Sequence, residues 1–292
     1  MNNISTFRQL YYTCKEQNKP IYEIALDYEV SKGEYTEYNV RLQAKKSLDA
    51  MKDAIKIGLN STEPSPSGMS GDDCNKLQKR FKTSNAILGE TAQKIMTYAL
   101  ATSEQNLRMG RIVACPTAGS CGIVPAVLIA YAEDYGISES DQIHALITAG
   151  EVGRLVANKM ALAGAVGGCQ AECGVASAMA TSALTQMRGG SVKQIINAVA
   201  LALKNVLGLT CDPVCGLVEI PCVKRNPFLA IHAVTASELA MSDIISKIPI
   251  DEVVDAMEQT GQLMSPLLKE SSQGGLAKTK TAIALEKNIL KK

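Results

Sequence analysis

Tryptophan is absent from this sequence, and aromatic residues make up only 4% of its 292 residues. The core must therefore be built from aliphatic and small side chains, and the Ala-, Gly- and Ser-rich tracts predict helices that approach one another closely. A surplus of positive charge is also lacking, because 30 Lys and Arg stand against 29 Asp and Glu. This balance argues against a nucleic-acid-binding protein. With 46% hydrophobic and 20% charged residues, the chain has enough apolar surface to fold.

Long hydrophobic runs are missing as well, since Pro125, Gln170 and Glu172 interrupt the best candidates for a membrane span. No charged-then-apolar leader with a cleavage site opens the chain. We therefore expect a soluble, cytoplasmic protein with no membrane partner. The nine cysteines are an odd number in a chain of this length without an export signal, which favours reduced thiols or metal thiolates over a disulfide framework.

Helical periodicity dominates what is present. Apolar side chains recur every three or four residues up to about residue 58 and again from about Thr83 to Leu107. Residues 60–68 (NSTEPSPSG) concentrate turn formers and predict a loop. Strand-like alternation is scarce, so we predict an all-α fold, with 1–60 as an amphipathic N-terminal segment and 61–292 as the main helical domain. Further helices are expected after Gly122, at about 140–160, 171–187, 191–207, 228–246 and 250–263, and at the basic C-terminus, with a non-helical segment between Leu209 and Asn226.

The cysteines form no C-x-x-C pair, and only two histidines, His144 and His232, are present, so zinc-finger patterns are not supported. Cys14 and Cys74 have no second potential ligand nearby in the sequence and are interpreted as ordinary thiols. The other seven lie in break-rich segments, from which ligands could reach a metal cluster from several directions. Small helical cores also bury cysteine freely, so spacing alone leaves both interpretations open. These seven are Cys115, Cys121, Cys169, Cys173, Cys211, Cys215 and Cys222.

Three sequence blocks resemble a known family. They are CPTAGSCGIVPA at 115–126, GGCQAE at 167–172 and CDPVCGLVEIPCVKRN at 211–226. All three are similar to the signature blocks of the iron-sulfur-dependent L-serine dehydratases, alpha chain. Shorter pieces at 67–73 (SGMSGDD), 249–257 and 273–277 match as well. The resemblance extends from about residue 5 to residue 290 and is weakest over the first 60 residues.

The resemblance implies a [4Fe-4S] cluster held by three cysteines, which here are Cys169, Cys211 and Cys222. They are 42 (169 to 211) and 11 (211 to 222) residues apart. Three protein ligands would leave one iron open as a Lewis acid. The implied reaction converts L-serine to pyruvate and ammonia, a carbon-nitrogen lyase activity that needs no pyridoxal phosphate and is oxygen-sensitive. Small or apolar residues are common in the family at the positions of the other four, which we interpret as packed thiols: Cys115, Cys121, Cys173 and Cys215.

Polar and small residues in two blocks are candidates for binding the substrate. Thr117, Ala118, Gly119 and Ser120 open the apolar helix, and we predict that their N–H groups and hydroxyls hold the substrate carboxylate. An N-cap with a closely packed glycine is the alternative. Ser67 lies in a polar, glycine-containing loop that we predict to close over the substrate, with a plain solvent-exposed loop as the alternative.

The general base stays unassigned, because His144 and His232 lie in helical stretches where the family pattern has no fixed histidine. The two-chain type of the family implies a separate beta chain, which we expect to supply the base or part of the pocket. Many members read Asn-Ala-Ser-Ile-Ser-Gly where residues 159–164 read KMALAG. A close analogue of serine, such as cysteine or threonine, therefore remains an alternative substrate.

Two interpretations from other functional classes also remain. A non-catalytic electron-transfer subunit would use a fourth thiol, such as Cys173 or Cys215, and would lose its cluster when that thiol is replaced by serine. A structural helical subunit would use its cysteines for packing alone and would hold no iron.

Overall fold

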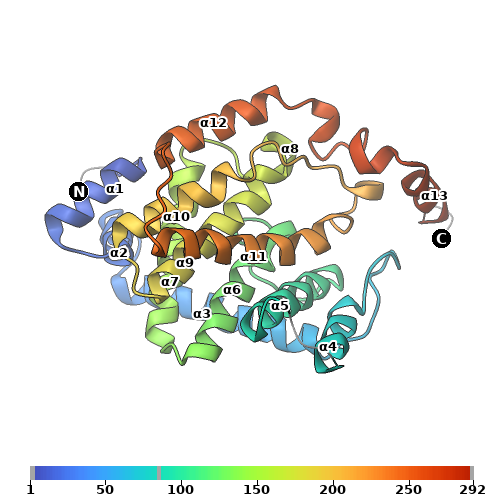
Figure 1. Ribbon diagram of the computed structural model, residues 1–292, viewed down its shortest axis with the longest axis horizontal. Helices are drawn as coiled ribbons and strands as arrows, with labels where there is room; N and C mark the ends of the chain where they lie inside the picture. The colour runs from blue at the N-terminus through green and yellow to red at the C-terminus, as the bar shows by residue number, and fades with distance from the viewer. Residues whose placement is uncertain (1–3, 84–86, 290–292) are drawn as a thin grey trace.

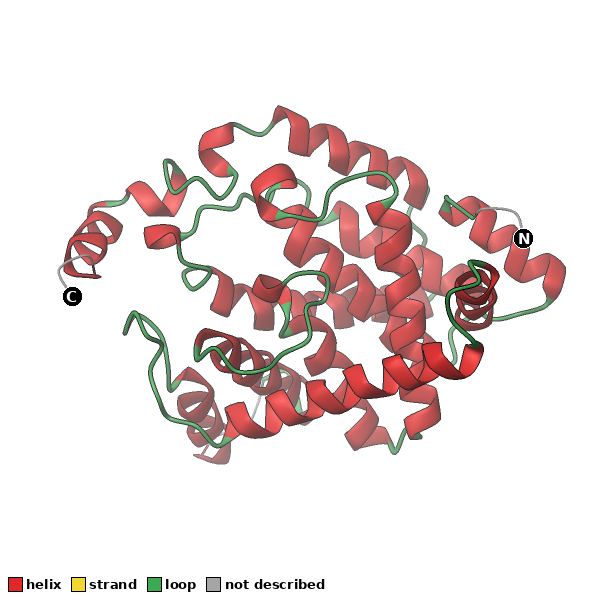
Figure 2. Ribbon diagram, turned by 180° about the vertical axis from the view of Figure 1, so that it is seen from behind, coloured by secondary structure: helices red, strands yellow, loops and turns green. Residues whose placement is uncertain are grey.

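The computed structural model describes residues 4–83 and 87–289, and within these ranges the chain is built from helices and loops without a β-strand (Figures 1 and 2). The predicted all-α class is therefore confirmed. The α-helices are α1 (Phe7–Gln17), α2 (Ile21–Ser31), α3 (Glu37–Leu59), α4 (Asp73–Thr83), α5 (Glu90–Leu107), α6 (Ile123–Tyr135), α7 (Glu139–Ala157), α8 (Gly164–Gly167), α9 (Val175–Met187), α10 (Val192–Lys204), α11 (Cys222–Met241), α12 (Ile250–Leu263) and α13 (Lys280–Ile289). Short 3₁₀ turns are η1 (Ala118–Ser120), η3 (Val214–Gly216), η4 (Pro266–Leu268) and η5 (Gly275–Lys278), and η2 (Gln170–Gly174) is a π-helical turn.

Helix α9 is the centre of the molecule. Its residues Val175–Thr185 are buried on every face, and most of them are Ala, Ser or Thr. A helix buried on all sides needs neighbours all round, and α9 packs against α6, α7, α10 and α11. The small side chains let these helices approach closely, as the lack of aromatic residues predicts. The hydroxyl groups of α9 that face inward donate hydrogen bonds to backbone carbonyls. Thr181 Oγ1, for example, donates to the carbonyl of Ser177 at 2.7 Å.

Helices α1 and α3 begin at residues that cap them. Thr6 and Thr36 accept hydrogen bonds from the backbone N–H groups of Gln9 and Asn39, and each pair forms a complete capping box. Such caps satisfy backbone donors that a helix leaves unpaired. Helix α3 crosses the back of the molecule (Figure 2) and packs against α5 and α7. Leu10 and Leu48 from this region belong to the same buried cluster as the residues of α9.

Two helix boundaries differ from the sequence-based expectation. Helix α11 begins at Cys222 rather than near residue 228, because Pro221 is its N-cap residue and a proline directly before the first turn does not interrupt a helix. The helix expected from about Thr83 to Leu107 begins later, because α4 ends at Thr83 and α5 begins after Gly89, whose φ of 82° interrupts the helical backbone. Residues 84–86 of the expected helix lie outside the described residues.

The N- and C-terminal segments lie at opposite ends of the molecule, with α13 on the far side from α1 (Figure 1). None of the helices in the described ranges is both long and apolar enough to cross a membrane. The division into segments 1–60 and 61–292 stays a prediction.

Candidate metal centre

Cys169 and Cys211 come together in the folded chain although 42 residues separate them in sequence (169 to 211). The Cys169 Sγ, the Cys211 Sγ and a carboxylate oxygen of Glu172 all lie within 4.8 Å of one another, and all three residues are buried. Soft thiolates and a hard carboxylate in one small buried volume are a donor set that can bind a metal.

Backbone contacts fix the two thiols in place. Cys169 precedes η2, whose Gln170 bonds to the carbonyl of Leu209 through its backbone N–H (3.0 Å) and to that of Met257 through Nε2 (2.9 Å). Cys211 forms an isolated parallel bridge with Lys269, in which the Cys211 N–H donates to the carbonyl of Leu268 at 2.8 Å. The surrounding fold therefore fixes the backbone position of both cysteines.

Cys222 lies at the edge of this group. It is buried at the first turn of α11 and is close enough to Cys169 and Glu172 to interact with them electrostatically, and burial raises the pKa of its thiol to about 12. Asn226, one turn later, donates from Nδ2 to the carbonyls of Cys222 and Gly119, both at 2.9 Å. The start of α11 is thereby tied to η1.

Hydrogen bonding and charge favour the thiolate form of Cys169. Its pKa is held well below the ordinary value by hydrogen bonds from Cys173 and Cys211, and the nearby Arg225 guanidinium lowers it further. Arg225 is itself anchored, because it donates to the carbonyl of Thr210 at 2.8 Å and to Asp212 Oδ1 at 3.1 Å. A positive charge beside a buried thiolate offsets the cost of burying it.

Glu172 is a site residue that sequence reasoning did not assign. The Thr117 hydroxyl donates to Glu172 Oε1, and Cys169 Sγ lies 3.8 Å from Oε2. Burial raises the pKa of this carboxyl to about 7. One signal was present in the sequence: Glu172 follows Cys169 by three residues, and residues three apart share a helix face.

Two glycines leave room for the Glu172 carboxylate. A Cβ at Gly119 would lie 2.5 Å from Glu172 Oε1, and a Cβ at Gly164 would lie 3.0 Å from Oε2 and 2.9 Å from Cys211 Sγ. Any other residue at these positions would enter the space that the thiol and the carboxylate share. The centre is thus a tight, buried space where η1 and α8 each pack against η2.

The segment Thr117–Ser120 does not open the apolar helix as expected. Residues 118–120 form the separate turn η1, and α6 begins only at Ile123. The difference arises because the Ser120 hydroxyl is turned inward, where it donates to the carbonyls of Cys115 (3.2 Å) and Thr117 (3.3 Å). Thr117 and Gly119 nevertheless reach the centre, through their contacts with Glu172.

Ser67 lies against a second buried carboxylate that sequence reasoning missed. The hydroxyls of Ser65 and Ser67 donate to Glu219 Oε1 and Oε2, at 2.5 and 2.6 Å. Glu219 is 2% exposed and stands three residues before Cys222. The loop 60–72 is therefore fastened to the turn that leads into α11.

The two histidines have other contacts. His144 stacks on Tyr22 with ring centroids 4.0 Å apart, and Arg41 Nη1 lies 2.7 Å from its Nε2. His232 Nδ1 lies 2.8 Å from the Ser177 hydroxyl, between α11 and α9. Both histidines therefore lie among other side chains, and neither belongs to the group of Cys169, Cys211 and Glu172.

The remaining cysteines differ from one another. Cys14, Cys74, Cys115 and Cys121 are buried, and Cys215 is half-buried in η3. Cys173 is also buried, but its Sγ lies 3.9 Å from that of Cys169, so it belongs to the centre. All nine cysteines are free thiols.

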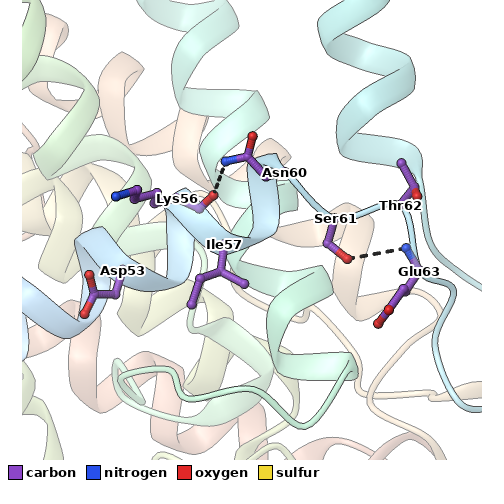
Figure 3. Close-up of a pocket in the computed structure, with 7 residues that line it drawn as sticks. All are labelled: Asp53, Lys56, Ile57, Asn60, Ser61, Thr62 and Glu63. Carbon is purple, nitrogen blue, oxygen red and sulfur yellow. Dashed lines mark hydrogen bonds between the residues drawn. The ribbon is translucent and has the colours of Figure 1, made fainter.

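A surface hollow of about 780 Å³ lies elsewhere, at the C-terminal end of α3 and the start of the following loop (Figure 3). Its polar groups partly satisfy each other: Asn60 Nδ2 donates to the carbonyl of Lys56 at 2.7 Å, and the Glu63 N–H donates to Ser61 Oγ at 3.4 Å. These bonds end the helix and shape the loop. The hollow contains none of the cysteines.

The fold and the site together define an all-α protein with a buried thiol-carboxylate centre suited to a metal. A family model described as "Serine dehydratase alpha chain" matches residues 16–277. The chain belongs to this serine dehydratase alpha-chain family.

Individual relatives agree with the family match. The chain is 43% identical to a probable L-serine dehydratase alpha chain of Bacillus subtilis, over 97% of this chain and 94% of that protein. It is 37% identical to the L-serine dehydratase alpha chain of Peptoniphilus asaccharolyticus, over 99% of each. It is 38% identical to the L-serine dehydratase TdcG of Escherichia coli, over 81% of this chain but 55% of that protein.

Proposed function

We propose that this chain is the catalytic subunit of an L-serine ammonia-lyase, which converts L-serine to pyruvate and ammonia. The observation that carries the proposal is the convergence of Cys169, Cys211 and Glu172 on one buried point in a chain of the serine dehydratase family. Relatives of nearly the same length bear the name L-serine dehydratase alpha chain.

The residues of the centre fit a [4Fe-4S] cluster held by Cys169, Cys211 and Cys222. Two lines of support are the thiol-rich donor set and the glycines that keep the space free of side chains. Thiolates are the usual protein ligands of such clusters. When bound through three thiolates, the cluster would supply an open iron that acts as a Lewis acid toward the β-hydroxyl of the substrate.

The chain's own residues then have distinct tasks. Glu172 accepts the proton from Cα of serine, since its carboxylate is buried in the centre and burial raises its pKa to about 7, near the pH at which a general base works best. The Thr117 hydroxyl orients Glu172 through its bond to Oε1. Loss of the proton and of water yields aminoacrylate, which tautomerises to an imine and hydrolyses to pyruvate and ammonia.

Ser67, Thr117, Ala118, Gly119 and Ser120 remain the proposed substrate-contacting residues. Thr117 and Gly119 border the Glu172 carboxylate, while Ser67 lies on the loop fastened to Glu219. We place the substrate carboxylate toward η1 and the loop 60–72 over it. Cysteine or threonine is the second substrate candidate, because residues 159–164 (KMALAG) depart from the pattern common in the family.

A separate beta chain is the proposed partner, and the cytoplasm the proposed compartment. The alpha-chain names of the relatives support a two-chain enzyme. The chain matches only 55% of the Escherichia coli relative, so that protein carries a large additional segment. The beta chain would take the place of that segment.

The function is tested by producing this chain with its beta chain under anaerobic conditions. We expect iron and sulfide to copurify, and pyruvate to form from L-serine faster than from threonine or cysteine. An iron-free preparation that is fully active would contradict the proposal. Iron without any lyase activity would favour the electron-transfer subunit, and absence of both would favour the structural subunit.

Replacing Thr117 with Val tests the orientation of Glu172. The substitution preserves shape but removes the hydroxyl that bonds to Oε1, so we expect kcat/KM to fall about 10- to 100-fold. Steady-state kinetics with L-serine measure the effect. The matched control is Thr235→Val on α11, whose hydroxyl bonds only within its own helix and whose loss should leave kcat/KM unchanged. Equal kinetics in the two variants would show that the Thr117 bond is not used.

A further inference from the structure

Cys173 occupies a special position beside the proposed ligands. It is the fourth residue of the π-helical turn η2, one turn after Cys169, and both thiols are fully buried. The two Sγ atoms are 3.9 Å apart, within hydrogen-bonding distance for sulfur. Cys173 also interacts electrostatically with Glu172 and Cys222, so it faces the same buried space as the proposed ligands.

The proton between the two sulfurs can be assigned by chemistry. A cysteine that binds iron does so as a thiolate and carries no proton. If Cys169 is a ligand, the only S–H between the two sulfurs belongs to Cys173, and the hydrogen bond runs from Cys173 to Cys169. Hydrogen bonds to the sulfurs of an iron-sulfur cluster are among the factors that set its reduction potential.

We infer that Cys173 is a positioning residue whose thiol donates a hydrogen bond to the Cys169 sulfur and makes the cluster harder to oxidise. The inference rests on the proposed function. The physical reason is that a donor withdraws electron density from the thiolate, which stabilises the reduced cluster relative to the oxidised one. If the bound cluster were oxidised in air, it would pass one electron to dioxygen and give superoxide, and removal of the donor would accelerate this loss.

The test compares Cys173→Ala, which has no donor, with Cys173→Ser, which has a hydroxyl donor. Both are made in the two-chain enzyme and purified anaerobically. Three quantities are measured: iron per chain, the midpoint potential by electron paramagnetic resonance, and the rate at which visible absorbance decays in air. We expect wild-type iron content in both variants. We also expect about a tenfold faster decay and a lower midpoint potential in Cys173→Ala, and near wild-type values in Cys173→Ser.

Cys14→Ala is the matched control, because it also deletes a buried thiol, but from α1. Its decay rate should equal that of the wild type. Equal decay and potential in Cys173→Ala and the control would overturn the inference, even with iron and pyruvate formation intact in the wild type. Loss of iron from anaerobically purified Cys173→Ala would also overturn the inference, because it would show that Cys173 is an iron ligand. A wild-type protein without iron would instead defeat the proposed function and the inference with it.

Discussion

Replacing Glu172 with Gln should lower kcat by about 10²- to 10⁴-fold, the usual contribution of a positioned general base. The amide has nearly the size of the carboxylate and can still accept the hydrogen bond from Thr117, but it cannot take up the Cα proton. Iron content should remain at the wild-type level. The measurements are kcat for pyruvate formation and iron per chain on the same anaerobic preparation.

The matched control is Glu270→Gln, because Glu270 is an exposed acid whose charge also acts on Glu172. If removal of a negative charge from this neighbourhood were enough to abolish activity, both variants would fail alike. An inactive Glu172→Gln that has lost its iron would mean that the carboxylate is a ligand. The assignment as a base would then be wrong.

Substituting Ser for Cys222 should remove the cluster and with it the lyase activity, by at least about 100-fold, since losing a ligand costs more than losing a group that supports one. A serine hydroxyl is a hard donor that binds iron of a cluster poorly. Iron analysis and the visible absorbance of the anaerobic protein measure the first effect, and pyruvate formation the second. The protein should keep its helical circular dichroism, because Cys222 is a small residue at the start of a helix held by Asn226.

Cys215→Ser is the control for this experiment. Cys215 lies seven residues earlier in the same block, is half-buried in η3, and is not part of the group formed by Cys169, Cys211 and Glu172. Its replacement should leave iron unchanged. A Cys222→Ser protein with a full complement of iron would show that the third ligand is another group, and Glu172 would be the candidate because it already lies with Cys169 and Cys211.

Helical periodicity was sufficient to predict the class of fold and most helices. The expectation of a helix at 250–263 agrees with α12 at both ends, because Pro249 and the amphipathic pattern mark its start. The start of α11 was misplaced, since Asp212-Pro213 and Pro221 were taken to exclude a helix up to Asn226. Pro221 is the N-cap residue of α11, where a backbone N–H has no partner within the helix, so the helix can begin directly after it.

The site was only partly visible in the sequence. The three predicted cysteines came from a family resemblance, and their spacing carried no information on whether they meet. Glu172 and Glu219 were overlooked because an acidic residue in a sequence is ordinarily exposed. Their roles depend on burial and on hydroxyl partners from other segments, Thr117 and Ser67, at sequence separations of 55 and 152 residues.

Amino-acid composition and periodicity by themselves determined that this chain forms a helical protein with closely packed small residues and reduced cysteines. These properties follow from the helix preferences of individual residues and from the need to bury apolar side chains, and both can be read from the sequence. Only the tertiary structure determined which thiols lie close together, which carboxylates are buried away from water, and which positions require a glycine. Those outcomes depend on contacts between distant segments, and helix packing sets them to within a few ångströms only after the whole core has assembled.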